Sequence, residues 1–346
     1  MSAENTAGLF LKACRREPVP RTPVWFMRQA GRYMREYRDL RERHSLLELC
    51  QTPELAARIT VEAAQKLGVD AAIIFADLLL PAQAMGMKLE FVEKEGPVIA
   101  APLRTADAVR KLREVGDGEL SYVAESIRIT RRELAGKLPV IGFSGAPFTL
   151  ASYMIEGGAS RDFAETKGLI YRQPQVWQEL MEKLVKVLSH YLETQVVAGA
   201  EALQIFDSWV GCLSPGDYRR YVLPYSQRLI GNLKHPGVPV IHFGTGTASL
   251  LELMRQAGGD VIGLDWRVDL GDAWRRVGYD RAVQGNLDPV VLLGPMENIR
   301  QEVERILQSA QGRPGHIFNL GHGVLPTTPV ETVQAAAEMV HNFRFG

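Results

Sequence analysis

Ala71-Ala72-Ile73-Ile74-Phe75 is the stretch that decides the fold. Five consecutive apolar residues leave no polar side for solvent, which is typical of a strand covered on both faces in a parallel sheet. Similar short apolar runs recur along the whole chain, separated by longer amphipathic segments. We therefore predict eight strands, at residues 24–27, 71–76, 140–144, 202–206, 238–243, 261–264, 282–284 and 316–319.

The segments between these strands have the pattern of helices. The first begins with Thr52 as a candidate N-cap and Pro53 at the first helical position, where its missing N–H would have no partner anyway. Apolar residues then recur at four-residue spacing until Gly68, a typical helix stop. Longer helical patterns cover about 177–197 and 329–343.

Alternation of strands and helices fits two architectures, a closed (β/α)8 TIM barrel and an open doubly wound sheet. The count of eight units and the lack of any linker favour the barrel, as one α/β domain over residues 1–346. Residues 81–104, after the second strand, do not fit the repeat and are expected to form an insertion near the barrel mouth. Residues 1 to about 16 are expected to be a flexible tail.

Composition excludes several functional classes. Lysine plus arginine and aspartate plus glutamate both total 40, so the net charge is zero, whereas nucleic-acid binding usually needs a basic face. No run approaches the roughly 18 apolar residues of a membrane span. The three cysteines, Cys14, Cys50 and Cys212, are scattered, and the N-terminal stretch lacks the apolar core of a secretory signal. We therefore expect a soluble cytoplasmic protein without nucleic-acid or membrane partners.

Polar residues gather where the predicted strands end, and in this type of barrel the loops at those ends carry the chemistry. They are Arg28 and Arg32 after the first strand, Asp77 after the second, and then Asp207, Ser208, His242, Asp265, Asn286, Asp288 and His322 after later strands. Four of these residues could instead be helix N-caps: Asp207, Ser208, Asp265 and Asp288.

The arginine pair is the sharpest local signal. Four residues apart, Arg28 and Arg32 would lie on one face of a helical turn, where two like charges repel unless an anion lies between them. Guanidinium groups hold carboxylates bidentately, so the pair predicts an anionic substrate. The alternative is a surface ion-pair network with Glu36 or Asp39, and Arg35 and Arg38 fit a solvated surface better.

Asp77 stands among apolar residues, where an unpaired carboxylate is costly. It must meet a cation, N–H donors or a proton of its own; a structural aspartate bonded to loop N–H groups is the alternative. Further candidates are Tyr153, beyond the shaped loop 142–149, and His322, between two glycines. A single tyrosine or histidine is more often structural, but the flanking glycines favour a functional role for His322. No phosphate-binding loop, HExxH motif or thiol-rich zinc site is present.

Taken together, these segments resemble the uroporphyrinogen decarboxylase family. The resemblance extends from about residue 8 to the end, and its motifs occur in the family's order. They are Met27-Arg28-Gln29-Ala30-Gly31-Arg32-Tyr33, Ile74-Phe75-Ala76-Asp77, the segments 142–149 and 153–158, Gly263-Leu264-Asp265-Trp266, the segment 284–289 and Asn319-Leu320-Gly321-His322-Gly323.

The resemblance implies an activity. Members of this family remove the carboxyl groups of the four acetate side chains of uroporphyrinogen III, giving coproporphyrinogen III and carbon dioxide in haem biosynthesis, with no metal or prosthetic group. It also implies a homodimer. The residues that match the family's catalytic positions are Asp77, Arg28 and Arg32, and those that match its substrate-binding positions are Arg28, Gln29, Ala30, Gly31, Arg32, Asp77, Tyr153, Ser208 and His322.

Two other functions compete with this one. Related barrels are zinc-dependent corrinoid methyltransferases, which need a His-x-Cys pair on the fifth strand and a later cysteine. Here Phe243 and Gly244 follow His242, so that ligand set is broken. A non-catalytic tetrapyrrole-binding protein would be expected to lose Asp77 or an arginine, and neither is lost. The proton donor stays open between Arg28 itself and a water held by Arg28 or His322.

Overall fold

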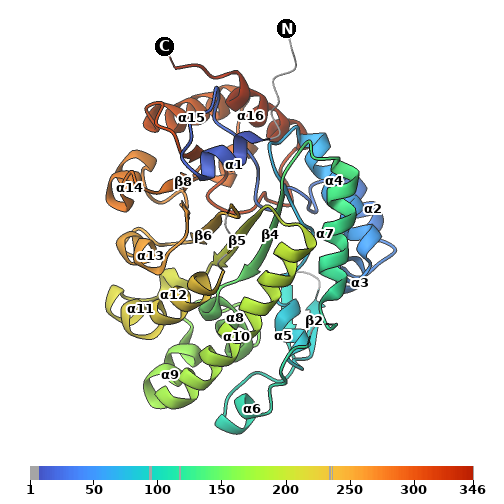
Figure 1. The fold of residues 1–346 in the computed structure, drawn as a ribbon, viewed down its shortest axis with the longest axis vertical. Coiled ribbons are helices and arrows are strands. Elements are labelled where there is room, and N and C mark those ends of the chain that lie inside the picture. Colours follow the sequence, from blue (N-terminus) through green and yellow to red (C-terminus); the bar gives the residue numbers. More distant parts are fainter. Residues whose placement is uncertain (1–7, 93–95, 117, 234, 236, 346) are drawn as a thin grey trace.

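The strands form one parallel sheet at the centre of the molecule, with the helices outside it (Figure 1). The computed structural model describes residues 8–92, 96–116, 118–233, 235 and 237–345. The seven strands of the sheet follow chain order. They are β1 (Ala72–Ile73), β4 (Val140–Gly145), β5 (Ala202–Asp207), β6 (Val240–Gly244), β7 (Val261–Gly263), β8 (Ala282–Gln284) and β9 (His316–Ile317).

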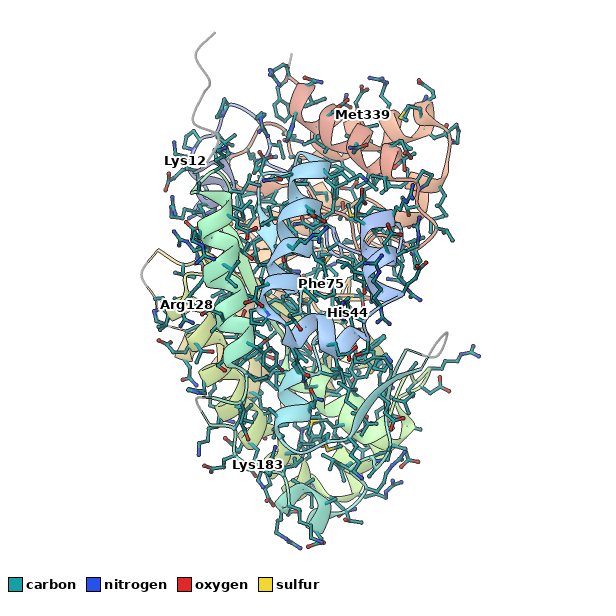
Figure 2. The ribbon with its side chains drawn as sticks, turned by 90° about the vertical axis from the view of Figure 1, so that its right-hand side faces the viewer. Lys12, His44, Phe75, Arg128, Lys183 and Met339 are labelled. Atoms are coloured by element: carbon teal, nitrogen blue, oxygen red, sulfur yellow. The ribbon has the colours of Figure 1, made fainter. Side chains whose placement is uncertain are left out.

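A helix crosses back over the outside of the sheet after each of the seven strands, and one more, α4, precedes the first strand. These crossover helices are α4 (Pro53–Leu67), α7 (Ser121–Leu134), α10 (Pro174–Ala198), α12 (Leu223–Asn232), α13 (Leu251–Ala257), α14 (Leu270–Val277), α15 (Met296–Ser309) and α16 (Val330–Asn342). Neighbouring crossover helices pack together, and Figure 2 shows α4 and α7 side by side on one flank. Strand pairing is parallel throughout this sheet, as the apolar runs predict.

Shorter elements lie between the strands and these helices. They are α1 (Leu9–Cys14), α2 (Arg35–Arg41), α3 (Leu46–Gln51), α5 (Leu80–Ala84), α6 (Ala106–Arg110), α8 (Pro147–Glu156), α9 (Ala164–Arg172), α11 (Pro215–Tyr221) and the 3-10 helices η2 (Val210–Cys212) and η3 (Pro289–Leu293). No helix in the described part of the chain is long and apolar enough to cross a membrane. All three cysteines carry free thiols.

The segment around Val24 closes the sheet. Val24 forms a parallel bridge with Phe318, just beyond β9, and its carbonyl accepts a hydrogen bond of 2.8 Å from the N–H of Asp70, just before β1. The chain therefore runs between the two outer strands of the sheet and joins them. The predicted (β/α)8 barrel is confirmed, with its first strand reduced to a bridge.

The prediction of a four-residue strand at 24–27 is wrong for a local reason. The chain turns at once, because the N–H of Gln29 donates to the Phe26 carbonyl at 3.0 Å and Arg28 adopts a left-handed φ of 58°. The N–H of Met27 donates to the Asn319 side chain at 3.1 Å instead of to a neighbouring strand. Strand pairing therefore stops after one residue, and the arginine loop begins.

Two predictions at the start of the chain need correction. Residues 9–14 are not a tail but form α1, with Phe10 and Cys14 buried; residues 1–7 of the expected tail lie outside the described residues. Pro53 and Gly68 bound α4 as expected. Thr52 occupies the N-cap position without capping, because its hydroxyl donates to the Glu48 carbonyl of α3 at 2.8 Å.

The expected insertion is a hairpin of β2 (Leu89–Val92) and β3 (Gly96–Ile99), which pair antiparallel. It lies against the end of α8: the N–H of Ile99 donates to the Gly157 carbonyl at 2.8 Å, and the N–H of Leu103 donates to the Met154 carbonyl at 2.8 Å. The insertion therefore supports the helix that carries Tyr153.

Asp70 holds the closure together. Its carboxylate accepts hydrogen bonds from Arg21 (2.6 and 2.8 Å), from the N–H of Val24 (2.8 Å) and from His341 of α16 (3.0 Å). Burial alone raises the pKa of this carboxyl, but the hydrogen bonds from Arg21 and His341 outweigh burial and hold the pKa below its ordinary value. One buried anion thus links the arginine-loop segment, the start of β1 and the last helix.

Replacing Asp70 with Asn should lower the free energy of unfolding by about 3 kcal/mol, because Arg21 loses its buried partner. The folded-state pKa lies below the unfolded one, so this contribution is present above about pH 3.9 and is lost as the pH falls through the folded value. Denaturant unfolding at several pH values measures both effects. Asp39→Asn, at an exposed pair with Arg35, is the control and should cost under about 1 kcal/mol. Equal losses for the two variants would contradict this role.

Candidate active site

The loops after Val24, β1, β4, β5 and β9 meet at the mouth of the barrel, and each supplies one predicted site residue. Arg28 follows the closing segment, Asp77 follows β1, Tyr153 lies on α8 after β4, Ser208 follows β5 and His322 follows β9. Because the strands are parallel, all five loops leave from the same end of the barrel. These five predicted residues therefore lie at the same end of the fold.

The side chain of Arg28 is exposed. Its direction follows from the left-handed backbone conformation of Arg28 and from the contact with Gly323. A Cβ on Gly323 would lie 2.4 Å from Cδ of Arg28, so the arginine side chain lies directly on this glycine. Neither Arg28 nor Arg32 makes an ion pair within the described residues. The surface-network alternative is wrong, because Glu36 pairs with Lys66 at 2.6 Å and Asp39 with Arg35.

The predicted helical turn at 28–32 is also wrong. Turns and bends occupy residues 27–34, and α2 begins only at Arg35. Arg38 is not merely solvated: its guanidinium donates to the main-chain carbonyls of Arg32 (3.0 Å) and Tyr33 (2.9 Å) and so holds the loop. The two guanidiniums are thus presented by a braced loop.

Tyr37 is a buried tyrosine of α2 whose hydroxyl responds to charges of the site. Burial raises the pKa of Tyr37 to about 12; among the charges, Arg41 and then Arg32 lower the pKa, while Cys50 and then Asp77 raise it. The Tyr37 ring also contacts Phe75, two residues before Asp77, with 5.5 Å between the ring centroids. Tyr37 therefore packs against the segment that leads to Asp77.

Asp77 is a half-buried carboxylate with little compensation. One oxygen accepts a hydrogen bond of 2.8 Å from the N–H of Leu79, the one donor it has in the described part of the chain. Burial raises the pKa of the carboxyl above its ordinary value, and the Leu79 hydrogen bond and the Arg28 charge lower it by less. A fully satisfied structural aspartate would have more donors, so Asp77 is a carboxyl group short of N–H partners.

Tyr153 lies close to both charges. Burial, reinforced by the negative charge of Asp77, raises the pKa of its hydroxyl to about 12, while Arg28 lowers it. Its ring packs edge-on against Trp209, with centroids 5.5 Å apart. Thr149 of α8 donates to Asp207 at 3.1 Å and accepts from the N–H of Trp209 at 3.4 Å. These bonds fix the turn in which half-buried Ser208 directly precedes Trp209.

His322 is held between two positively charged groups. Burial first, and then Arg28 and Arg267, lower the pKa of its imidazole to about 4, against a smaller opposing effect of Asp265. Both flanking glycines allow close approach: Gly323 packs on Arg28, and a Cβ on Gly321 would lie 2.4 Å from the N of Trp266. His322 is therefore neutral at physiological pH.

Other polar residues at the strand ends are buried. Asp207, His242 and Asp265 are fully buried, with His242 3.6 Å from Asp207. Asp288 caps η3, because its side chain accepts a hydrogen bond of 2.9 Å from the N–H of Val290, so the prediction of a cap is confirmed for Asp288. The same prediction is wrong for three other residues, which cap no helix: Asp207, Ser208 and Asp265.

Gln29 differs from its neighbours because its side chain is fully buried. Its main chain is also engaged, because its N–H donates to Phe26 and its carbonyl accepts from the Tyr33 hydroxyl at 2.6 Å, while Ala30 and Gly31 are half-buried. A surface cavity of about 450 Å³ between α2 and α4 is lined by Ala30 but by none of Asp77, Tyr153 or His322. The charged residues of the predicted site therefore lie at the mouth of the barrel and do not line this cavity.

Two residues at the site were not predicted from the sequence, Trp209 and Arg267. Trp209 directly follows the predicted pair Asp207-Ser208, and Arg267 directly follows the Asp265-Trp266 motif. Their positions directly after predicted strand ends could have identified both as site residues. Among the described residues, no group of three His, Cys, Asp or Glu side chains could hold a metal ion.

Replacing Arg28 with Gln should raise the pKa of His322 from about 4 toward its ordinary value near 6.5, because one of the two adjacent positive charges is removed. NMR titration of the imidazole measures this shift. The control is Arg35→Gln, at the exposed pair with Asp39, which should leave the titration unchanged. A wild-type His322 that titrates near 6.5 would show that the site is not as described.

Comparisons with known proteins agree on one family. The family model described as uroporphyrinogen decarboxylase (URO-D) matches residues 5–343. A protein of Carboxydothermus hydrogenoformans named uroporphyrinogen decarboxylase is 59% identical over 96% of this chain and 95% of its own length. One of Koribacter versatilis with the same name is 56% identical over 99% of this chain and 97% of its own.

Among solved structures, a methyltransferase from Methanosarcina mazei matches with a TM-score of 0.79 at 20% identity, covering 97% of this chain and 98% of that one. At that identity the likeness shows the shared barrel fold alone. The family match and the far higher identity of the named relatives decide between the two barrel families. The chain belongs to the uroporphyrinogen decarboxylase family of carboxy-lyases.

Proposed function

We propose that this protein removes the acetate carboxyl groups of uroporphyrinogen III, giving coproporphyrinogen III and carbon dioxide. The observation that carries this proposal is Asp77: a half-buried carboxylate with a raised pKa and one N–H donor, next to the Arg28 charge. A reduced tetrapyrrole can dome so that its four pyrrole N–H groups point at one anion. Asp77 lacks the donors that such a ligand would supply.

The two arginines of the loop bind substrate carboxylates in this proposal. Arg28 and Arg32 are exposed and make no ion pair within the described residues, so their guanidiniums are available for bidentate contacts. The main chain at Gln29–Gly31 lies between them. Tyr153, Ser208 and His322 then act as neutral hydrogen-bonding groups around the ring, and Trp209 keeps Tyr153 in place.

The reaction uses the pyrrole itself as the electron acceptor. Protonation of the ring at its α-carbon makes a cation, which accepts the electron pair of the breaking carbon–carbon bond as the carboxylate of the adjacent acetate leaves as carbon dioxide. Protonation of the remaining exocyclic methylene then gives the methyl group, and loss of the α-proton restores the pyrrole. Ionised Asp77 beside the ring nitrogens stabilises that cation. The loss of one preorganised electrostatic group of this kind typically raises a barrier by about 3–4 kcal/mol.

His322 is not the proton donor in this proposal. A donor must carry a proton at the working pH, and the pKa of His322, lowered to about 4, leaves its imidazole neutral. A water held by Arg28 fits better, since the guanidinium orients a water without losing its own proton. We propose no metal or cofactor. A homodimer and a cytoplasmic location, expected from the resemblance and the cysteine usage, complete the proposal.

Replacing Asp77 with Asn should lower kcat by at least about 100-fold, because the cationic ring loses its counter-charge. In the wild-type protein, kcat/KM should fall as the pH drops through the raised pKa of Asp77, since protonation removes the anion. Coproporphyrinogen formation is the assay. Asp288→Asn, which changes a helix-capping carboxylate at the same end of the barrel, is the control and should leave kcat unchanged. A fully active Asp77→Asn variant would exclude this mechanism.

The protein should discriminate strongly between uroporphyrinogen and oxidised, planar uroporphyrin, which cannot direct all its nitrogens at Asp77. Anaerobic incubation with each compound, in the presence of a metal chelator, measures carbon dioxide release. We expect turnover of the porphyrinogen only. Equal turnover of both compounds contradicts the role of Asp77, and binding without any turnover would point to a non-catalytic tetrapyrrole-binding protein.

A further inference from the structure

The loop after β7 carries an arginine at the mouth of the barrel. Arg267 is anchored by Asp265, which is fully buried. The Asp265 carboxylate accepts from Nη1 of Arg267 at 2.6 Å, from the N–H of Arg267 at 3.2 Å and from the N–H of Gly246 at 2.6 Å. The buried carboxylate therefore has several donors, and it fixes one end of the guanidinium.

The rest of the guanidinium is free for a ligand. Its carbon lies 3.9 Å from the centroid of the Trp266 ring, so the plane of the group rests on the indole. The Arg267 side chain is 51% exposed, and Nε and Nη2 have no partner within the described residues. One edge of a fixed guanidinium thus faces solvent with its donors unused.

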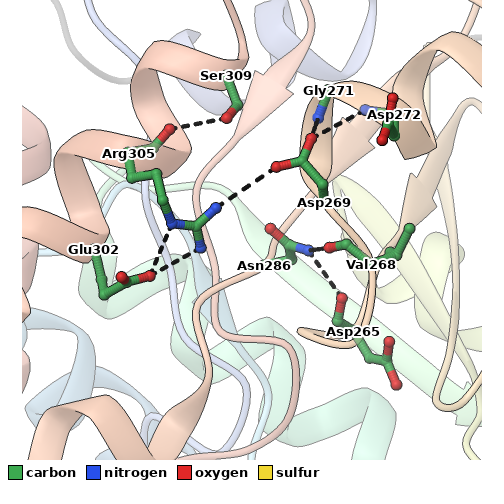
Figure 3. A network of polar contacts seen from close by, with 9 residues as sticks. All are labelled: Asp265, Val268, Asp269, Gly271, Asp272, Asn286, Glu302, Arg305 and Ser309. Carbon is green, nitrogen blue, oxygen red and sulfur yellow. Dashed lines mark hydrogen bonds and ion pairs between the residues drawn. The ribbon is translucent and has the colours of Figure 1, made fainter.

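The loop that carries Arg267 is braced from both sides (Figure 3). Asn286 donates to the main-chain carbonyls of Asp265 (2.9 Å) and Val268 (2.7 Å). Asp269 caps α14 and lies 3.6 Å from Arg305 of α15. Rigid support of this kind reduces the entropy lost when a ligand binds.

Arg267 lies on the opposite side of His322 from Arg28. The glycine before His322 contacts the Asp265-Trp266 backbone, and the glycine after it contacts the Arg28 side chain. After burial, the charges of both guanidiniums lower the pKa of His322, in agreement with these two contacts. The mouth therefore has a cation on each side of this neutral histidine.

We propose that Arg267 is a third carboxylate-binding residue, which helps the site select a highly carboxylated tetrapyrrole. The inference rests on the proposed function and adds a residue to it. Uroporphyrinogen carries eight carboxylates around its ring, and the arginine loop offers guanidiniums on one side only. Arg267 holds a further carboxylate on the other side of His322, with its free edge, while Asp265 and Trp266 keep the group in place.

The test is the steady-state kinetics of Arg267→Gln with uroporphyrinogen III. We expect KM to rise about tenfold, as the loss of one charge-assisted hydrogen-bonding partner implies, with kcat within about twofold of wild type. Arg267→Lys should recover part of the loss, since it restores the charge but not the planar fork. Arg275→Gln is the matched control on α14; it removes an exposed arginine paired with Asp272 and should leave both constants unchanged.

A purely structural Arg267 would behave differently. If its only role were to neutralise Asp265, Arg267→Gln would lower the melting temperature and kcat while KM stayed constant, and that result would overturn the inference. Should Arg267→Gln fold poorly, the double variant Asp265→Asn/Arg267→Gln removes the buried charge and must still show the raised KM. Inactive wild-type protein would instead overturn the proposed function, and the inference with it.

Discussion

The closure of the barrel at Val24 is the constraint on which the rest of the structure depends. One residue bridges the two outer strands, and the buried carboxylate of Asp70 holds it there through its N–H, Arg21 and His341. Because pairing stops after one residue, the chain turns into the loop that carries Arg28. Closure at this point brings that loop between the end of β1, with Asp77, and the end of β9, with His322.

The mouth is organised around charges that the protein leaves uncompensated. Asp77 has one N–H donor, Arg28 has no ion-pair partner in the described chain, and burial and two guanidiniums keep His322 neutral. Such an arrangement costs stability, because a buried charge without partners is unfavourable. In the function proposed above, a ligand with carboxylates outside and N–H groups inside would supply these partners.

Much of this could be predicted from the sequence, because strand ends in a parallel barrel converge without further information. The apolar runs located seven strands of the sheet, and the residues after them gave Asp77, Ser208 and His322. Local conformation was predicted less well. The predicted helical turn at 28–32 was wrong, because Arg28 adopts a left-handed φ. The predicted Thr52 cap was wrong, because the Thr52 hydroxyl donates to a carbonyl of the preceding helix.

The sequence by itself determined the order of the units, the family and the types of side chain available, because apolar periodicity and motif order are properties of the chain alone. Only the tertiary structure decided which charges are compensated. Asp265 and Asp77 both follow apolar strands, yet the first is paired by Arg267 and Gly246 and the second has one donor. The difference includes a donor from another strand's loop, the N–H of Gly246, which reaches Asp265 only when the barrel has folded.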